Sequence, residues 1–377
     1  MPSRRFSGNN HWYHETLSTG NHPAPPFATE AAKSTDPFLL GADANADRPL
    51  QQVIRYRSAV QQINIALYQR LFPATVITSN LHTLTLYDRL SSALTVAQVT
   101  GIQRLCNHYA ARLNPLPGPD SSRESNQRLT QITEYARLMA GQPARLNAAA
   151  LQRLDEVGLT LPDIISFHQL IGFVCYQARI VAGIQALTGQ ALRWLPGQSV
   201  NPDAPFMALD AQASWQAHLD YPQTRYLSDR QRDIVTKCKP SDFPAGILCL
   251  LVQDEQLLSA IAQLHSETGS INPLVQAVCA CINGSAWCLQ QYADSQRRSL
   301  LQAGVDTLPA GSFTPAEQAI IHAAVWLTRA PDRFSAGHLH ALRQQMTTAQ
   351  IWLLIEQIAF TNWKNRLFQT LGSLSPQ

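Results

Sequence analysis

The sequence predicts an all-α protein. Between residues 53 and 72, apolar residues recur at the three- and four-residue spacing of one helix face. Capping patterns mark further helix starts: Thr160 precedes Asp163 by three residues, and Thr314 is followed by Pro315 in the way that helices begin. The alternation typical of strands is not sustained anywhere in the chain, so helices are expected to form nearly all of the regular structure.

The composition favours a large globular protein that assembles with further subunits. The 377 residues are enough for two domains, since domains typically have about 100–200 residues. Charged residues make up 15% of the chain, against about 25% in ordinary proteins. Because so little charge is available to cover the surface, we expect a partner subunit to cover part of it, and therefore a homo-oligomer.

Charge and cysteine content exclude several classes of function. The net charge is +3 and the basic residues are scattered, so no nucleic acid is expected as a partner. The longest uninterrupted apolar run, residues 243–252, is far shorter than the ~20 residues of a membrane span, and the N-terminus lacks the apolar stretch of a secretory signal. The seven cysteines contain no CxxC pair. We therefore expect a cytoplasmic protein with free thiols, no membrane contact, no metal and no cofactor.

The chain divides into four segments. Residues 1–50 are polar and include HPAPPFA, which cannot be helical. They are expected to form an arm that either wraps a partner or is disordered, and the aromatic HWYHE near its start favours docking for that piece. Residues 51–190 and 223–377 are expected to be two helical domains. Residues 191–222, rich in Pro, Asp and Gly, are expected to link them.

The two expected domains repeat one sequence pattern. IGFVCYQARI from Ile171 and IAFTNWKNRL from Ile358 both fit I-x-F-x-x-aromatic-x-x-Arg-aliphatic. The two blocks lie 187 positions apart: their arginines, Arg179 and Arg366, differ in number by 366 − 179 = 187. Upstream, residues 143–154 match residues 331–342 at an offset of 188. Because the matches keep their order over about 40 residues, the sequence predicts a tandem duplication of a helical unit.

The repeated arginine has two interpretations. Arg179 and Arg366 each stand on an otherwise apolar helix face. Such an arginine either belongs to a buried ion pair or anion site, or packs between helices and donates to backbone carbonyls of a neighbouring segment. The sequence favours the packing role, because both copies keep the arginine whereas one copy alone has cysteines in a plausible site.

One segment of the second half has the setting of a reactive cysteine. A helix is expected to start at Asn272-Pro273 and to break at Asn283-Gly284. Ser285 is expected to cap a new helix whose first turn contains Cys288. The partial positive charge of a helix N-terminus stabilises a thiolate and lowers the pKa of a thiol. Cys288 is therefore the candidate nucleophile.

This segment resembles the alkylhydroperoxidase (AhpD) and carboxymuconolactone decarboxylase (CMD) family. The resemblance is carried by Asn-Gly-x-x-aromatic-Cys at residues 283–288, by FTPAE at 313–317, by LTRAPDR, and by IAFTNWKNRL, which is similar to the family's closing helix. It covers residues 240–377 well and 50–190 more faintly. The resemblance implies an AhpD-like helical fold, assembly through helices, and a peroxidase that uses a hydroperoxide and an external thiol reductant.

The sequence departs from the family at three of the four positions of the site. The family's peroxidases carry a CxxC whose second Cys attacks the peroxide and whose first resolves it, with a Glu and a His relaying the proton. Here the first Cys is Ser285 and the second is Cys288, while Tyr292 stands for the His and Pro273 for the Glu. The resemblance thus implies that the attacking thiol is kept, whereas the resolving thiol and the groups that relay its proton are lost. It therefore implies that any peroxidase turnover is weak. Ser285 and Tyr292 remain as hydrogen-bond donors to Cys288 or to a ligand.

Three functions stay open at this stage: a thiol-dependent oxidoreductase acting through Cys288, a non-catalytic protein that binds a small molecule or assembles with partners, and an enzyme of the decarboxylase branch. In the first, the oxidised Cys288 is reduced by an outside thiol or by Cys279 or Cys281, which lie two apart on one helix and cannot share a face. In the first half, Cys106 and His108 resemble a decayed copy of the motif and are expected to be structural.

Overall fold

Helices form nearly all of the regular structure in the described residues, as the sequence predicts. The structure, a computed structural model, describes residues 36–191, 200–210, 212–221, 224–237 and 243–375. The HWYHE segment and most of the predicted arm lie outside the described residues. The helices of the first half are α1 (Arg48–Tyr56), α2 (Ser58–Leu71), α3 (Leu86–Thr100), α4 (Gln103–Leu113), α5 (Arg123–Gly141), α6 (Ala148–Glu156) and α7 (Leu161–Leu187), with short 3₁₀ helices η1 (Ala42–Asn45) and η2 (Pro143–Arg145).

The second half continues the helical pattern. Its elements are η3 (Thr224–Tyr226), α8 (Asp229–Lys237), α9 (Ala245–Leu251), α10 (Glu255–Thr268), α11 (Pro273–Asn283), α12 (Ala286–Gln290), α13 (Ser295–Ala303), α14 (Pro315–Arg329), η4 (Pro331–Arg333), η5 (Ala336–Leu339), α15 (His340–Arg343) and α16 (Thr348–Thr370). Two short strands, β1 (Ser214–Ala217) and β2 (Gly372–Ser375), pair antiparallel. The indole N–H of Trp215 in β1 donates to the carbonyl of Phe368 at 2.8 Å, which ties the end of the predicted linker to α16.

The predicted helix starts are confirmed by their capping bonds. Thr160 and Thr314 each form a capping box with the residue three positions later, and Thr347 does the same at the start of α16. The prediction of one continuous helix over residues 53–72 is wrong in one respect. The helix is interrupted at Arg57, which separates α1 from α2. The guanidinium of Arg57 reaches Glu356 of α16 at 2.8 Å, so the break places a cation beside a buried carboxylate.

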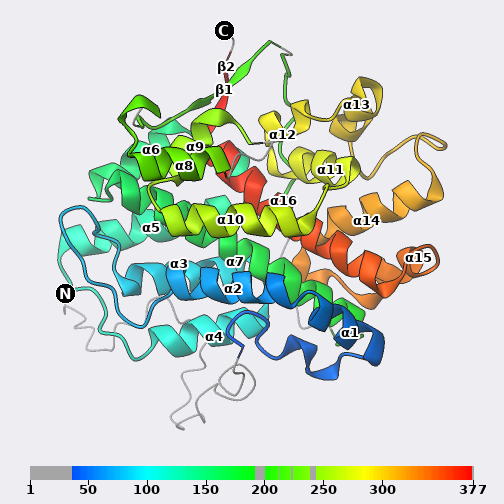
Figure 1. The fold of residues 1–377 in the computed structure, drawn as a ribbon, viewed down its shortest axis with the longest axis horizontal. Helices are drawn as coiled ribbons and strands as arrows, with labels where there is room; N and C mark the ends of the chain where they lie inside the picture. The colour runs from blue at the N-terminus through cyan, green and yellow to red at the C-terminus, as the bar shows by residue number, and fades with distance from the viewer. Residues whose placement is uncertain (1–35, 192–199, 211, 222–223, 238–242, 376–377) are drawn as a thin grey trace, which may run out of the picture.

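The long helices α7 and α16 form the centre of the molecule and pack against each other, while α2 and α10 run side by side in front of them (Figure 1). Helix α7 is long and apolar enough to cross a membrane by length and composition, but 89% of its apolar window is buried inside the protein. Burial among the other helices accounts for its apolar character. The close approach of the two helices depends on Gly172 of α7, which lies against the ring of Trp363.

Each half contains a helix that ends at a left-handed glycine and is followed by further helices, the last of them long. In the first half, α3 ends at Gly101 in the left-handed conformation (φ 70°), followed by α4, α5, η2, α6 and α7. In the second half, α11 ends at Gly284 (φ 76°), also left-handed, followed by α12, α13, α14, η4, η5, α15 and α16. The buried apolar side chains of both halves belong to one continuous cluster. The described residues therefore share one core.

The described ends of the predicted arm and linker pack onto the helices. Phe38, from the last part of the segment predicted as an arm, is buried, and its ring contacts Phe173 and Tyr176 of α7 at centroid distances of 5.7 and 5.6 Å. In the predicted linker, the backbone N–H of Ala204 donates to the carbonyl of Ile282 at 3.1 Å. These described parts thus contact the chain's own core.

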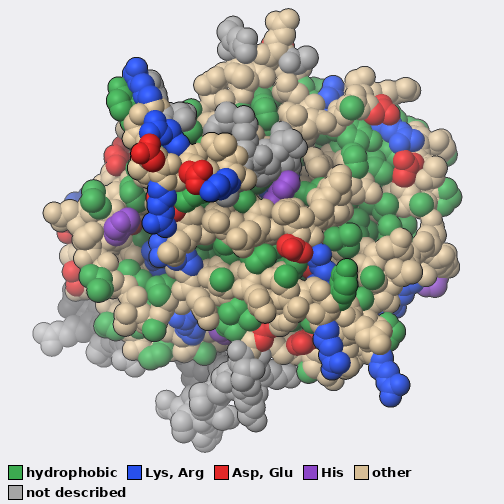
Figure 2. Space-filling model, in the orientation of Figure 1, with side chains coloured by type: hydrophobic (Ala, Val, Ile, Leu, Met, Phe, Trp, Pro, Cys, Tyr) green, Lys and Arg blue, Asp and Glu red, His purple; other side chains and the backbone are tan. Residues whose placement is uncertain are grey.

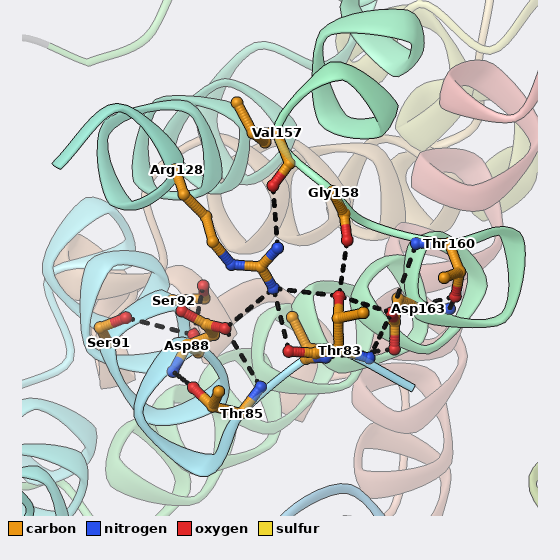
Figure 3. Close-up of polar contacts among 11 residues, drawn as sticks. Thr83, Thr85, Asp88, Ser91, Ser92, Arg128, Val157, Gly158, Thr160 and Asp163 are labelled. Carbon is orange, nitrogen blue, oxygen red and sulfur yellow. Dashed lines mark hydrogen bonds and ion pairs between the residues drawn. The ribbon is translucent and has the colours of Figure 1, made fainter. Parts of the chain in front are cut away.

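A polar network joins the start of α7 to the start of α3 (Figure 3). The carboxylate of Asp163 accepts from the backbone N–H of Thr83 at 2.7 Å and from its hydroxyl at 2.9 Å. Arg128 of α5 donates to the carbonyls of Val157 and Thr83 at 2.9 and 3.1 Å, and to Asp88 at 3.1 Å. Most of these bonds satisfy backbone groups at helix ends, so the network has a structural role.

Charged side chains are sparse on the visible surface. On the face shown in Figure 2, Lys and Arg side chains are interspersed with Asp and Glu among neutral ones. The large exposed apolar side chains include Tyr56, Ile77 and Phe206, which come from separate parts of the chain. The visible surface thus has few charged side chains, in line with the composition. The homo-oligomer that this low charge suggests stays a prediction.

The buried Glu356 is expected to make stability depend on pH. Burial raises the pKa of Glu356 from 4.5 to about 7, although Arg57 opposes the shift. A raised pKa means that the folded state binds the proton more tightly, so this contribution is complete below pH 4.5 and is lost as pH rises through about 7. Between pH 4 and pH 8 we expect a loss of about 3 kcal/mol in the free energy of unfolding.

Urea unfolding at several pH values tests this expectation. In the Glu356→Gln variant, the pH-dependent loss attributed to Glu356 should disappear. The matched control is Glu267→Gln, because Glu267 also contacts Arg57, at 3.7 Å, but its side chain is 42% exposed; this variant should keep the loss. Equal pH profiles for wild type and Glu356→Gln would contradict the assignment.

Candidate functional site

The turn between α11 and α12 positions the candidate nucleophile. Helix α11 starts with Asn272 as its cap, whose side chain accepts from the N–H of Leu274 at 2.9 Å. It ends at Gly284, where a Cβ atom would lie 2.6 Å from the Cβ of Ala144 and 2.9 Å from that of Ala204. Glycine is therefore required both by the left-handed backbone and by the close packing of the turn against the first half.

Cys288 lies in the first turn of α12, where the sequence predicts it, and it is 6% exposed. Ser285 occupies the cap position, but its side chain makes no capping bond, and its buried Oγ has no hydrogen-bond partner among the described residues. The prediction that Ser285 caps the helix is therefore wrong for its side chain. Because α12 has five residues, few peptide dipoles add up behind Cys288, and the helix contributes little to thiolate stability.

Tyr292 lies two residues after the end of α12 and is buried. Burial raises the pKa of its phenol, and the nearby Arg297 opposes this effect. The hydroxyl thus stays protonated at neutral pH and is available as a hydrogen-bond donor. Unlike the His that the resembled family has at this position, it cannot take a proton from a thiol near pH 7.

Cys279 on α11 is the second thiol of the site. It is fully buried, and its Sγ lies 3.2 Å from the hydroxyl of Thr328 and 3.6 Å from the amide of Asn362. Burial raises the pKa of Cys279 to about 11; Thr328, Arg179 and Arg366 lower it, and Cys288 raises it. The effect of Cys288 is the smallest of these.

Cys281 lies in a different environment from Cys279. Burial raises its pKa to about 12, and the charges that act on it are those of Asp203 and Cys279. The Sγ of Cys279, by contrast, lies beside Thr328 and Asn362. The two thiols of α11 thus have different neighbours, as expected for residues that do not share a helix face.

A buried hydrogen-bond network surrounds Cys279. The side-chain oxygen of Asn362 accepts from the amide of Asn283 at 3.0 Å and from Arg366 at 2.9 Å, and the amide of Asn362 donates to Thr328 at 2.8 Å. Sequence reasoning missed Asn362 and Thr328 as site residues. The available signal was that both are polar residues within the apolar blocks IAFTNWKNRL and LTRA.

The repeated arginines pack against helix ends, as the sequence favours. Arg179 donates to the carbonyl of Thr328 near the end of α14 at 2.7 Å, and Arg366 donates to the carbonyl of Ala140 near the end of α5 at 2.7 Å. Each arginine also donates to a carbonyl of its own helix, Cys175 at 2.8 Å and Asn362 at 3.0 Å. Because helix C-termini carry partial negative charge, they stabilise these cations without a carboxylate.

The corresponding thiol of the first half has no such surroundings. The hydroxyl of Tyr68 lies 2.6 Å from Nε2 of His108, and burial lowers the pKa of His108 to about 4. Burial raises the pKa of Cys106 to about 12. Neither group ionises near neutral pH, in keeping with the structural role predicted for both. Within the described ranges, no group of three or more His, Cys, Asp or Glu side chains is arranged to hold a metal ion.

In comparisons with known proteins, no family model matches the chain, and no curated protein matches it with significant similarity. The chemistry of the site therefore has to be argued from its geometry. Two neighbouring helices, α11 and α12, each carry a buried thiol, and Cys279 lies in a hydrogen-bond network that includes the cation of Arg366.

Proposed function

We propose that this protein is a thiol-dependent oxidoreductase of the AhpD-like kind, which reduces small hydroperoxides slowly through Cys288 and uses Cys279 as the resolving thiol. The observation that carries the proposal is the position of Cys279: it is buried on α11, which packs against the short helix α12 that holds Cys288 in its first turn, and Cys288 contributes slightly to the raised pKa of its thiol. It supplies a second thiol at a site where the resembled family has one and where this chain has Ser285 instead.

The exposures of the two thiols assign their roles. Cys288 is 6% exposed and Cys279 is 0% exposed, so a peroxide meets Cys288 first. The thiolate of Cys288 attacks the terminal oxygen of R–O–O–H; an S–O bond forms, the O–O bond breaks, and the alkoxide takes the proton that the thiol released to give the alcohol. The thiolate of Cys279 then attacks the sulfenic acid sulfur, releasing hydroxide that is protonated to water. An external thiol reduces the resulting disulfide.

The rate is expected to be low because the site lacks a base. Pro273 and Tyr292 stand where the resembled family has Glu and His, and a positioned general base ordinarily accelerates such steps by about 10²–10⁴-fold. The raised pKa of Cys279 makes its thiolate scarce at neutral pH. The reaction we propose is therefore that of a slow peroxidase or thiol oxidase.

The arrangement of the helices supports a tandem duplication of an AhpD-like unit as the origin of this site. The arginine of each half donates to a backbone carbonyl near a helix end of the other half, Arg179 to Thr328 and Arg366 to Ala140. The two accepting residues are 188 positions apart, which equals the sequence offset between residues 143–154 and 331–342. We further propose that the chain forms a homo-oligomer, works in the cytoplasm, and takes its electrons from a small or protein dithiol.

Turnover of an alkyl hydroperoxide with excess dithiol tests the function. Wild type should consume the hydroperoxide, and Cys288→Ser should reduce the rate to that of the buffer. Cys281→Ser is the matched control, because Cys281 is also buried on α11 but is influenced by Asp203, whereas Cys279 lies beside Thr328 and Asn362; it should keep at least half of the activity. A Cys288→Ser variant with full activity, or an inactive wild type whose Cys288 stays reduced, would contradict the proposal and favour a protein that only binds a small molecule.

A further inference from the structure

A small cavity lies between the two halves of the chain and is lined by both repeated arginines, Arg179 and Arg366. Residues 99–100 line it from the first half, and residues 282–283 line it from the second. Its volume is about 20 Å³. Since one water molecule needs about 10–15 Å³ on this measure, the space accommodates one water molecule or one monatomic ion. The charge and hydrogen bonding of the lining decide between the two.

Each arginine has an N–H group on the cavity side that makes no hydrogen bond. Arg179 and Arg366 are 1% and 2% exposed, and the Nε of each has no hydrogen-bond partner among the described residues. In a guanidinium, the Nε–H lies on the same edge as the terminal nitrogen Nη2. The Nη2 atoms donate to the carbonyls of Thr328 and Ala140, and both acceptors line the cavity. The two Nε–H groups therefore point to the side of the cavity.

The two guanidinium groups carry positive charges that no carboxylate offsets directly. Within the described part of the chain, the charges that act on Arg179 are those of Arg366 and of two buried thiols, with no carboxylate among them. Burial and the neighbouring Arg366 lower the pKa of Arg179 to about 9. Arg366 itself donates to neutral groups of Asn362 and Ala140. The two cations therefore repel each other in the buried interior, where charges interact strongly.

Two helix ends compensate part of this charge. Helices α5 and α14 end beside the cavity, and their carbonyls at Ala140 and Thr328 accept from the two arginines. A helix C-terminus carries a charge of about −0.5, so the two ends contribute about −1 against two guanidinium charges. Asp203 and Asp306 pair with Arg329 at 2.6 and 3.0 Å, but both are partly exposed to solvent, which screens them. About one positive charge therefore remains to be balanced in the interior.

We propose that this cavity binds one monovalent monatomic anion, such as chloride, between the Nε–H groups of Arg179 and Arg366. Chloride accepts hydrogen bonds and donates none, which suits two donors that cannot pair with each other. It balances the remaining charge, which a water molecule does not. It is close to a water molecule in size, whereas sulfate and phosphate are too large for the cavity. Because Arg179 belongs to α7 and Arg366 to α16, the ion joins the two halves of the chain.

Thermal unfolding of the full-length protein in sodium chloride tests the site. Sodium gluconate at the same ionic strength is the reference, because its anion is too large for the cavity. An anion that binds the folded state alone raises the unfolding midpoint with the logarithm of its concentration. Wild type should show this rise in chloride and not in gluconate. Midpoints that are equal in the two salts mean that the cavity holds water, and overturn the proposal.

The Gly141→Ala variant narrows the cavity and keeps both arginines. A Cβ atom at this position lies 3.1 Å from Nδ2 of Asn201 and 3.3 Å from Cγ1 of Val99, which both line the cavity. The variant should need at least tenfold more chloride for the same rise in midpoint. Gly118→Ala is the matched control, since a Cβ atom there meets nothing within 4 Å, and it should respond as wild type does. An unchanged chloride response in Gly141→Ala overturns the assigned position.

Crystals of the wild-type protein soaked in sodium bromide locate the ion without any variant. Bromide replaces chloride and scatters anomalously, so a peak should lie within hydrogen-bond distance of Nε of both Arg179 and Arg366. A bromide-soaked crystal with no peak between the two arginines overturns the proposal. Neither measurement involves Cys279 or Cys288, so both results are independent of the thiol chemistry.

Discussion

Replacing Gly172 by alanine should destabilise the protein by about 4 kcal/mol. A Cβ atom at this position would lie 2.1 Å from Cδ1 and 2.3 Å from Nε1 of Trp363. The indole cannot move aside easily, because it is fully buried, its N–H donates to Gln169 at 3.1 Å, and its ring packs against Phe173 and Tyr176. The separation of α7 and α16 must therefore increase, which loosens the centre of the shared core.

Urea unfolding of Gly172→Ala measures this effect. The higher helix propensity of alanine returns only about 1 kcal/mol, so the net loss remains large. Gly118→Ala is the matched control, since a Cβ atom at Gly118 would meet nothing within 4 Å, and it should change stability by less than about 0.5 kcal/mol. A Gly172→Ala variant as stable as wild type would show that the two helices are not in contact as described.

The step in which Cys279 attacks the sulfenic acid of Cys288 and forms the disulfide should accelerate strongly with pH. The pKa of Cys279 is raised to about 11 by burial, and the thiolate is the attacking form. Below that pKa each pH unit increases the thiolate fraction tenfold, so the rate of disulfide formation should rise about 100-fold between pH 7 and pH 9. Rapid-quench trapping of the sulfenic acid on Cys288 gives this rate directly.

Cys279→Ser should stop after one equivalent of peroxide and accumulate the sulfenic acid. Serine keeps a hydroxyl beside Thr328 and Asn362, so the fold and the first step should be preserved. Cys281→Ser should retain the pH dependence of wild type. A resolution rate that does not change between pH 7 and pH 9 would show that a thiol other than Cys279 attacks.

The fold class followed from the sequence because local signals decide it. The capping patterns at Thr160 and Thr314 each depend on residues within one turn, and both are found in the structure. The break at Arg57 was not predictable in this way. Its cause is tertiary, because the guanidinium of Arg57 pairs with Glu356, which lies 299 positions away in the chain.

The candidate site was only partly predictable for a similar reason. The turn at Gly284 and the place of Cys288 follow from local sequence, and the structure has both. The role of Cys279 does not, because its partners Thr328 and Asn362 come from two other helices. Ser285 illustrates the opposite case, in which a residue with good local capping chemistry does not use it.

Peptide mapping of the oxidised protein tests the central claim most directly. Full-length protein is treated with one equivalent of hydroperoxide, free thiols are blocked, and the digest is analysed by mass spectrometry without reduction. The account predicts a disulfide between Cys279 and Cys288, absent in Cys288→Ser and unchanged in Cys281→Ser. A digest in which Cys279 and Cys288 both remain free thiols, or in which Cys288 is paired with Cys281, would contradict it.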